Sequence, residues 1–312
     1  MVDRVAIFTA NRAERGLLEP VYQALIEAGI SASWCDVELG PTISLKYLSP
    51  IINGFHAAVE YWREAYAMNR IWDIAIVPTD RIEMVGVALY LFTKNLPFAH
   101  FHAGDTGSGT HDEVFRFIIS RCASLHFCET QQSADTLFKL GEEAWRVKVV
   151  GSTAFDNVRI DYGLVPGPRP FDLVLIHPDT YSKEQTHKDI LQALSMVDKH
   201  AIIIGPNHDT NWEVIDMGIK NWIVGRKSYE LYLDGVSRPQ FHGLMEKCQR
   251  FITNSSSAMY EAPRFNTNIV NIGERNKNRK PVDVQTGGSQ KIAKILKDLV
   301  VRETLLRKKF AY

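Results

Sequence analysis

The sequence predicts an α/β protein with two domains, each built on a parallel sheet. Short apolar runs such as Val5–Phe8 alternate with amphipathic segments of helical length through most of the 312 residues. This alternation is typical of parallel sheets wound by right-handed crossovers. The run Val165–Pro170 holds three prolines and interrupts the alternation, so we interpret it as a linker. We therefore expect an N-terminal domain over residues 1–165, a C-terminal domain over residues 166–312, and a cleft between them at the carboxyl ends of the strands.

The apolar runs give the expected strands in order. In the first half they cover Val5–Phe8, Ile30–Trp34, Ile74–Val77, Phe98–Phe101, Leu125–Cys128 and Val147–Val150, and in the second half Leu173–Ile176, Ala201–Ile204, Trp222–Val224, Phe251–Thr253 and Asn268–Asn271. After the first run, Leu18, Val21 and Leu25 share one face of a helix that Gly29 ends. The tail Ser289–Phe310 has the same helical period, and we expect it to pack back on the first domain.

Composition excludes several classes of function. Lys+Arg and Asp+Glu both number 36, which gives no electrostatic case for binding nucleic acid or an anionic membrane. The longest apolar runs fall well short of the ~20 residues that a membrane-spanning helix needs. The four cysteines are scattered without metal-ligand spacing, so we expect reduced thiols, a cytoplasmic location, and neither a bound metal nor another cofactor.

The segment Phe251–Pro263 is the most informative part of the chain. An apolar run stops at Asn254 and three consecutive serines, Ser255–Ser257, and a segment of helical potential follows. A strand that turns into a helix in this way presents unpaired backbone N–H groups, which suit a phosphate. Capping of the helix by Asn254 and the serines explains the same residues equally well. Glu261, one helical turn further on, is placed to reach the hydroxyl groups of a ribose.

Other polar side chains follow the ends of the predicted strands. Asp80 comes directly after Ile74–Val77, and a loop with three glycines after Phe98–Phe101 carries Asp105, Glu113 and Arg116. So many titratable groups in one glycine-rich loop favour a functional site over simple capping. Arg12 follows the first strand, His177 follows Leu173–Ile176, and Arg275 lies in a basic loop after the last strand. The chain has no G-x-G-x-x-G turn for a dinucleotide and no G-x-S-x-G hydrolase elbow.

Taken together, these loops resemble the UDP-N-acetylglucosamine 2-epimerase family, and most closely its hydrolysing branch used in sialic-acid-type sugar synthesis. The matching segments are Thr9–Pro20, Asp80–Glu83, His102–Arg116, Gly151, His177–Pro178, Pro206–Asn207 with Asp209, Asn254–Pro263 and Asn271–Arg279. The resemblance implies two Rossmann-like domains in the glycosyltransferase-B arrangement. It also implies a UDP-sugar held mainly by the C-terminal domain, and a homodimer.

The resemblance also implies roles for individual residues. Asn254 and the three serines Ser255–Ser257 would bind UDP, with the serines on the diphosphate together with Arg12 and Arg275. Glu261 would bind the ribose, and His177 would face the sugar or diphosphate as a catalytic residue. Asp80, Asp105 and Glu113 match the positions of the family's catalytic carboxylates, and Arg116 would orient one of them. In the family reaction a base removes the C2 proton of the sugar while UDP leaves C1, and water then adds to the glycal to give N-acetylmannosamine.

Two departures from the family pattern keep other functions open. Asp105 stands where the family has a longer glutamate, and Phe117 stands where it has a histidine. Both departures favour a retaining glycosyltransferase on the same scaffold as the alternative function. A third alternative is a module that binds UDP-sugars without turnover, and Asp80, Glu113 and His177 argue against it.

Overall fold

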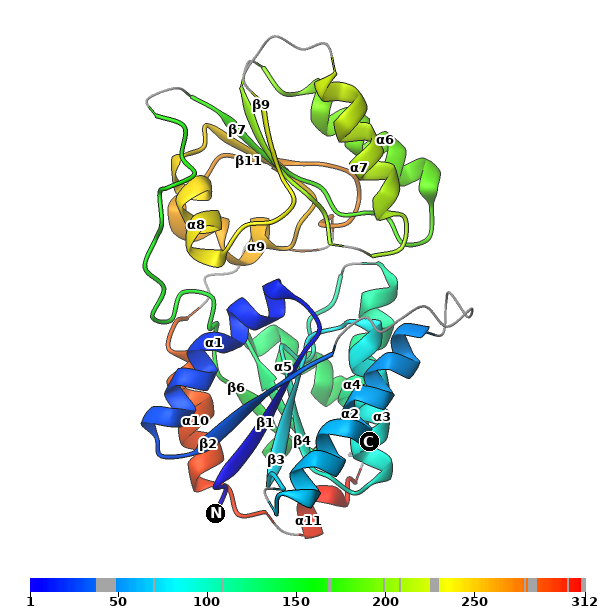
Figure 1. Cartoon of the computed structure of the whole chain (residues 1–312), viewed down its shortest axis with the longest axis vertical. Coiled ribbons are helices and arrows are strands. Elements are labelled where there is room, and N and C mark those ends of the chain that lie inside the picture. The colour runs from blue at the N-terminus through cyan, green and yellow to red at the C-terminus, as the bar shows by residue number, and fades with distance from the viewer. Residues whose placement is uncertain are drawn as a thin grey trace. The chain divides into compact units, whose positions relative to one another are not determined.

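A computed structural model of the chain describes residues 1–37, 49–69, 71–107, 109–167, 170–198, 200–207, 209–224, 230–277, 279, 285–301 and 303–309 (Figure 1). The chain forms two compact units, which we describe separately. Unit 1 comprises Met1–Thr106, Asp112–Asn157 and Val284–Tyr312, and unit 2 comprises Gly107–His111 and Val158–Asp283. The chain passes between the units several times, and one of these passages follows Asn157.

Unit 1 contains a parallel sheet with the strand order β2-β1-β3-β4-β5-β6. Its strands are β1 (Arg4–Thr9), β2 (Ser31–Asp36), β3 (Ile74–Pro78), β4 (Phe98–Phe101), β5 (Leu125–Cys128) and β6 (Val147–Val149). The residues of β3, β4 and β5 are buried throughout, because helices cover both faces of the sheet. Parallel pairing sets the ends of β3 and β4 side by side, with Pro78 opposite Phe101.

Two groups of helices cover the unit 1 sheet. On one face α1 (Arg12–Glu27) lies beside α10 (Gly288–Asp298), and Leu18 and Leu25 share a core cluster with Ile292 and Leu296 (Figure 1). The opposite face carries α2 (Ser49–Ala67), α3 (Ile82–Thr93) and α4 (His111–Cys122), while α5 (Gln131–Lys139) packs near β5 and β6. Gly86 allows α2 and α3 to approach closely, since a Cβ there would collide with the carbonyl oxygen of Ile51.

Unit 2 contains a second parallel sheet with the strand order β11-β10-β7-β8-β9. The strands are β7 (Asp172–Leu175), β8 (Ala201–Ile204), β9 (Glu230–Leu233), β10 (Arg250–Thr253) and β11 (Ile269–Asn271). One face packs against α6 (Lys183–Ser195) and α7 (Trp212–Ile223). The other face packs against α8 (Arg238–Lys247) and the short α9 (Ser257–Tyr260), and Figure 1 shows the two helix pairs on opposite sides of the sheet.

The predicted fold class is confirmed, because both units are α/β with a parallel sheet. The strand expected at Trp222–Val224 is wrong: Trp212–Ile223 is helical, since Ile215 and Ile219 repeat at helical spacing and are buried together. The strand in question is β9, eight residues later. The terminal helix is also shorter than expected, because α10 ends at Asp298 and a separate turn, α11, spans Glu303–Leu306.

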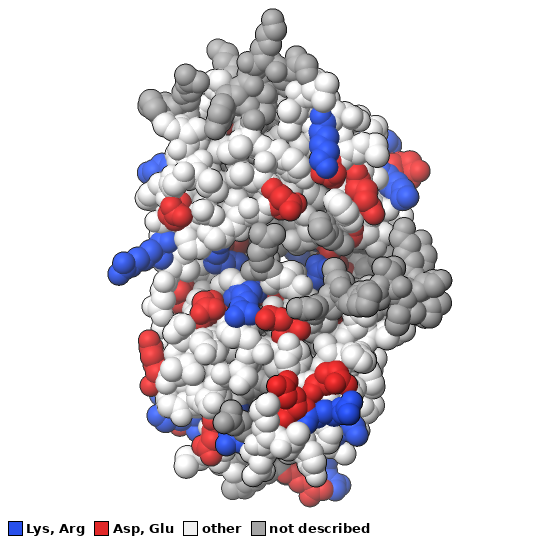
Figure 2. Space-filling model, viewed as in Figure 1, with Lys and Arg blue, Asp and Glu red and all other residues white. Residues whose placement is uncertain are grey.

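Described charged side chains of both signs are interspersed on the face shown in Figure 2. This distribution accords with the equal numbers of basic and acidic residues in the chain. Among the described residues, no helix is both long and apolar enough to cross a membrane.

Candidate active site

The carboxyl ends of β3 and β4 bring three of the sequence-predicted residues together in unit 1. Asp80 lies just beyond β3 and Asp105 just beyond β4, and these two strands are paired neighbours. Arg116 comes from α4 and is 5% exposed. Its Nη2 donates to Asp80 Oδ2, and its Nη1 donates to the carbonyl oxygen of Asp105 at 2.8 Å and to Asp105 Oδ2 at 3.2 Å. One buried guanidinium therefore holds two carboxylates in fixed positions.

Gly104 makes the turn into Asp105 possible. It has a φ of +81°, and a Cβ at this position would collide with the carbonyl oxygen of Ser133 on α5. The glycine-rich character of the loop therefore has a direct structural cause. Glu113 lies one helical turn before Arg116 on α4, which sets the two side chains on the same face of the helix, and it is partly exposed.

Glu83 belongs to the structural frame of the loop after β3. It lies in the first turn of α3, is 3% exposed, and pairs with Arg81 at 3.3 Å. This ion pair thus stabilises the start of α3 next to Asp80.

Sequence reasoning missed Glu14, a carboxylate on α1 that is 2% exposed. Its Oε2 accepts the N–H of Ala10, and its Oε1 accepts the hydroxyl of Thr79, both at 2.7 Å. Burial raises the pKa of Glu14 to about 7, although Arg81 opposes that rise. The available signal was local: Asn11 caps α1, and an acidic residue three positions later is typical of a capping box.

Some residues of the predicted site and linker lie outside the described part of the chain. Arg12 is the first residue of α1, but its side chain lies outside the described residues. Ser108, Pro168, Arg169 and Asn278, which belong to the glycine-rich loop, the linker and the basic loop, also lie outside them.

In unit 2 the loop after β10 is buried and is held by several hydrogen bonds. Ser255 is 6% exposed, its N–H donates to Thr253 Oγ1 at 2.9 Å, and its carbonyl oxygen accepts from Asn276 Nδ2 at 2.9 Å. The hydroxyl of Ser257 donates to that of Ser255 at 3.0 Å. Ser256 lies between them and is partly exposed. The three serines thus form one tightly folded turn at the carboxyl end of β10, which lies between β11 and β7 in this sheet.

The expectation that Asn254 caps a helix is wrong. Its Oδ1 accepts the N–H of His177 at 2.7 Å, and its Nδ2 donates to the carbonyl oxygen of His177 at 2.9 Å. This pair of bonds ties the end of β10 to the end of β7. The helix that follows, α9, has only four residues, and Ser256 at its N-cap makes no side-chain capping bond. Asn254 therefore has a tertiary role, which local sequence pattern does not reveal.

His177 and Arg275 lie close to each other beyond β7. Arg275 Nη1 donates to the carbonyl oxygen of Pro178 at 3.2 Å. Burial and, to a smaller extent, the positive charge of Arg275 together lower the pKa of His177 to about 3. The imidazole is thus neutral at physiological pH. Its Nδ1 is buried and has no hydrogen-bond partner among the described residues.

Glu261 directly follows α9, a single helical turn, as its C-cap residue, as the sequence predicts. Its Oε2 accepts from His242 Nε2 at 2.8 Å and from Arg238 Nη1 at 3.0 Å, and both donors come from α8. His242 is 1% exposed. The carboxylate is therefore held in a fixed orientation by two donors on a neighbouring helix.

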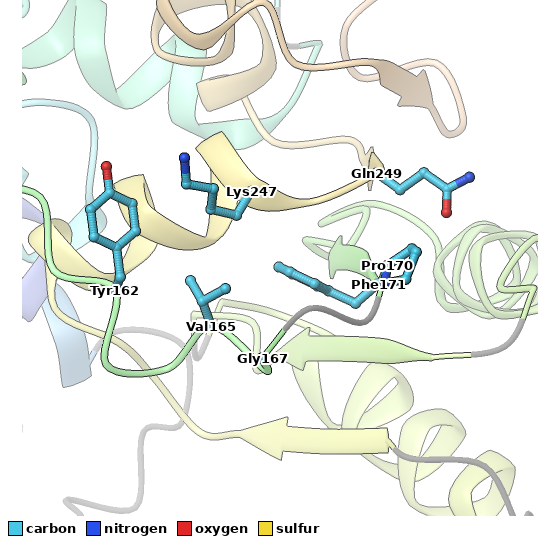
Figure 3. Close-up of a pocket in the computed structure, with 7 residues that line it drawn as sticks. All are labelled: Tyr162, Val165, Gly167, Pro170, Phe171, Lys247 and Gln249. Atoms are coloured by element: carbon cyan, nitrogen blue, oxygen red, sulfur yellow. The ribbon is translucent and has the colours of Figure 1, made fainter.

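A surface cavity of about 550 Å³ in unit 2 contains none of the predicted residues. It is lined by Tyr162, Val165, Gly167, Pro170, Phe171, Lys247 and Gln249 (Figure 3). Lys247 Nζ donates to Glu246 at 2.8 Å and lies 5.2 Å from the centre of the Tyr162 ring. Its charge is therefore already compensated by Glu246. Within the described part of the chain, no group of three His, Cys, Asp or Glu side chains is arranged to hold a metal ion.

Comparison with known families decides the identity of this scaffold. Residues 58–306 match the sequence model of the family described as UDP-N-acetylglucosamine 2-epimerase. The chain belongs to this family. The polysialic acid biosynthesis protein P7 of Escherichia coli is 27% identical over 88% of this chain and 80% of its own length. The hydrolysing UDP-N,N'-diacetylbacillosamine 2-epimerase of Legionella pneumophila is 26% identical over 91% of this chain and 84% of its own length.

Solved structures of the same family share the fold. The UDP-GlcNAc 2-epimerase from Neisseria meningitidis, bound to UDP-GlcNAc, gives a TM-score of 0.70 at 14% identity and covers 94% of this chain and 91% of its own. The enzyme from Methanocaldococcus jannaschii, in complex with UDP-GlcNAc and UDP, gives 0.69 at 16% identity, with 98% and 95% covered. At these identities the likeness to solved structures establishes the fold of this chain alone. The roles of individual residues follow from the contacts described above.

Proposed function

We propose that this family member is a hydrolysing UDP-N-acetylglucosamine 2-epimerase. The single observation that carries the proposal is the cluster of Asp80, Asp105 and Arg116, in which two carboxylates are fixed at adjacent strand ends of an epimerase-family scaffold. Glu113, one turn before Arg116, is the third carboxylate that we assign to catalysis.

The proposed reaction has two redox-neutral steps. A carboxylate removes the C2 proton, the C1–O bond to the diphosphate breaks with its electron pair leaving on UDP, and a C1=C2 double bond forms. Water then adds its hydroxyl to C1 while a proton returns to C2 on the opposite face, so that UDP-GlcNAc and water give N-acetylmannosamine and UDP. Because the C2 proton is weakly acidic, the reaction needs a well-positioned base, and the Arg116 cluster supplies fixed carboxylates for this task.

We assign the UDP half of the substrate mainly to the second part of the chain, residues 166–312, and the catalytic carboxylates to residues 1–165. Ser255, Ser256 and Ser257 would bind the diphosphate together with Arg275 and Arg12, and Glu261 would bind the ribose. Two features support this assignment. The serine turn is held rigidly by Asn276, and Glu261 is oriented by two donors, so both groups are preorganised. His177, being neutral, can donate a hydrogen bond to the leaving group without carrying charge.

The hydrolysing branch and the sugar are the finer parts of the proposal. The hydrolysing enzyme of Campylobacter jejuni, whose name gives GDP- or UDP-N,N'-diacetylbacillosamine as substrate, is 29% identical over 66% of this chain, and it joins the Legionella enzyme in favouring hydrolysis. The test is to incubate the purified protein with UDP-GlcNAc and, separately, with UDP-N,N'-diacetylbacillosamine, and to analyse both products. UDP with a free 2-epimeric sugar is the expected result. A UDP-linked epimer would exclude hydrolysis, and UDP release only with an added acceptor would favour a glycosyltransferase.

We further propose that the enzyme is a homodimer. Exposed apolar side chains gather on the helices of one face of unit 1, namely Ile52 and Phe55 on α2, Leu89 and Phe92 on α3, and Val114 and Ile118 on α4. Exposed apolar side chains that lie together on one face commonly mark an interface, and the shared face of these three helices supports the proposal. Light scattering should give twice the chain mass. Phe92→Glu should yield a monomer, whereas the control Met217→Glu, which alters an exposed residue of unit 2, should leave the dimer intact. A monomeric wild-type protein would contradict the proposal.

A cytoplasmic location completes the proposal. The four cysteines are free, with Cys35 and Cys128 buried, which is compatible with a reducing compartment. Cell fractionation should recover the protein with cytoplasmic markers, and recovery from outside the cytoplasm would contradict this assignment.

A further inference from the structure

Thr79, the residue immediately before Asp80, has an unusual backbone conformation. Its φ is +48°, in the left-handed region, which is rare for a β-branched residue. Such a conformation costs free energy and persists only where the surroundings impose it. Asp80 follows Thr79 directly, so the direction in which the chain leaves Thr79 determines where the Asp80 carboxylate lies.

Three hydrogen bonds impose the conformation of Thr79. Its N–H donates to the carbonyl oxygen of Phe101 at 2.9 Å, which extends the pairing of β3 with β4. Its carbonyl oxygen accepts from His100 Nε2 at 2.7 Å. Its hydroxyl donates to Glu14 Oε1 at 2.7 Å. Every polar group of Thr79 is therefore engaged, and two of the three partners are titratable side chains.

Both titratable partners are buried and fixed in their own right. His100 is fully buried, and because a carbonyl oxygen can only accept, Nε2 carries the proton and Nδ1 accepts from the hydroxyl of Ser120 at 2.8 Å. Glu14 is held by the N–H of Ala10. A carboxyl group and an imidazole are costly to bury, and capping of α1 alone does not account for the bond from Glu14 to Thr79.

We propose that Glu14 and His100 are positioning residues for Asp80, which hold Thr79 in its left-handed conformation so that the Asp80 carboxylate meets Arg116. The geometric part of this inference stands on the contacts of unit 1 alone. Its consequence for turnover rests on the function proposed above, in which Asp80 takes part in proton transfer. Neither Glu14 nor His100 needs to touch the substrate in this arrangement.

The test compares variants that change one side chain of the Glu14–Thr79 contact at a time. Thr79→Val removes the hydroxyl but keeps the branched shape, Glu14→Gln removes the charge at Glu14, and Thr79→Ser keeps the hydroxyl. Thr93→Val is the matched control, because the Thr93 hydroxyl also makes one bond in unit 1, at 2.9 Å to the carbonyl oxygen of Tyr90. Thr79→Gly provides a variant that accepts a positive φ without strain and so secures folding.

Two readouts separate positioning from a merely structural role. Crystal structures should show the Asp80 carboxylate displaced from Arg116 by about 1 Å or more in Thr79→Val and Glu14→Gln, and in place in Thr79→Gly, Thr79→Ser and Thr93→Val. In Thr79→Val and Glu14→Gln kcat should fall about 10- to 100-fold, with UDP affinity within about three-fold of wild type. The double variant of Glu14→Gln with Thr79→Val should be no worse than the poorer single variant, because both act on the same contact between Glu14 and Thr79.

The outcomes also separate this inference from the proposed function. An Asp80–Arg116 pair that stays unchanged in both Thr79→Val and Glu14→Gln would overturn the positioning role, whatever the protein catalyses. An unchanged kcat in the displaced variants would overturn its catalytic consequence. If wild-type protein turns over neither UDP-sugar, the proposed function fails, and the crystal structures still decide whether Glu14 acts on Asp80 through Thr79.

Discussion

The guanidinium of Arg116 donates to the carboxylate of Asp80, although the two residues are 36 positions apart in the chain. The same guanidinium also holds Asp105, which follows the neighbouring strand. Two carboxylates at adjacent strand ends would repel each other without an intervening cation, so Arg116 makes their close approach possible. The candidate catalytic centre is therefore defined by one helix residue and two strand-end residues.

Replacing Arg116 with lysine should disable the cluster. A lysine ammonium is a single point charge and cannot bridge two carboxylates as the planar guanidinium does. We expect kcat/KM for UDP release from UDP-GlcNAc to fall by roughly 10²-fold. Arg121→Lys is the control, since Arg121 lies on the same helix and its side chain is 39% exposed. Comparable rates for Arg116→Lys and Arg121→Lys would contradict this role of Arg116.

Replacing Asp105 with glutamate tests whether the shorter aspartate side chain impairs catalysis or suits the contact with Arg116. Arg116 Nη1 already bonds both the carbonyl oxygen and the carboxylate of Asp105. An added methylene would push the carboxylate out of this arrangement, so Asp105→Glu should lower kcat by about ten-fold despite restoring the family's usual residue. Steady-state kinetics of Asp105→Glu and wild type measure this difference in kcat. A higher kcat in Asp105→Glu would show that the aspartate carboxylate is poorly placed.

Glu14 should make the stability of the protein depend on pH. Its pKa is raised to about 7 in the folded state, so between its unfolded value and pH 7 the folded protein binds a proton that the unfolded chain has lost. Stability therefore falls as pH rises through this window, by up to about 3 kcal/mol relative to Glu14→Gln. Urea unfolding of both proteins at pH 4.5, 6 and 7.5 measures the difference. Parallel pH dependences would show that Glu14 is ionised throughout.

Asn254 should be essential to the geometry of unit 2. Asn254→Asp keeps the acceptor for the His177 N–H but sets a carboxylate oxygen against the His177 carbonyl, in a site that is 1% exposed. We expect a loss of about 1–3 kcal/mol in the free energy of unfolding, and UDP binding weakened by about ten-fold. Asn266→Asp, at an exposed left-handed position that both residues tolerate, should leave both quantities unchanged. Calorimetry of UDP binding is the direct measurement, and wild-type affinity in Asn254→Asp would contradict this role.

Much of the fold and part of the site could be predicted from the sequence, for a physical reason. In a parallel sheet the carboxyl ends of neighbouring strands lie together, so the positions of Asp80 and Asp105 after two successive strands already predict their proximity. Trp222–Val224 was misjudged because a short apolar run fits a buried strand or a helix end equally well, and only the burial of Ile215 and Ile219 distinguishes them.

The missed features depend on contacts between distant segments. Asn254 is of a residue type that commonly caps helices, yet its side chain forms hydrogen bonds with the backbone of His177, 77 residues away. Glu14 similarly satisfies a local capping pattern at Ala10 while its second oxygen bonds Thr79, 65 residues away. Local pattern predicts the contact of Glu14 with Ala10, whereas only the folded chain reveals the contact of Glu14 with Thr79 and both bonds of Asn254.

The most direct test of the account is exchange of the sugar C2 proton during turnover. The protein is incubated with UDP-GlcNAc in deuterated water without any acceptor, and the products are analysed by NMR and mass spectrometry. We expect UDP release together with an N-acetylmannosamine that carries deuterium at C2, and no turnover by Asp80→Asn while its UDP affinity stays within about three-fold of wild type. UDP release with the original proton retained at C2 would contradict elimination through the Asp80–Arg116–Asp105 cluster.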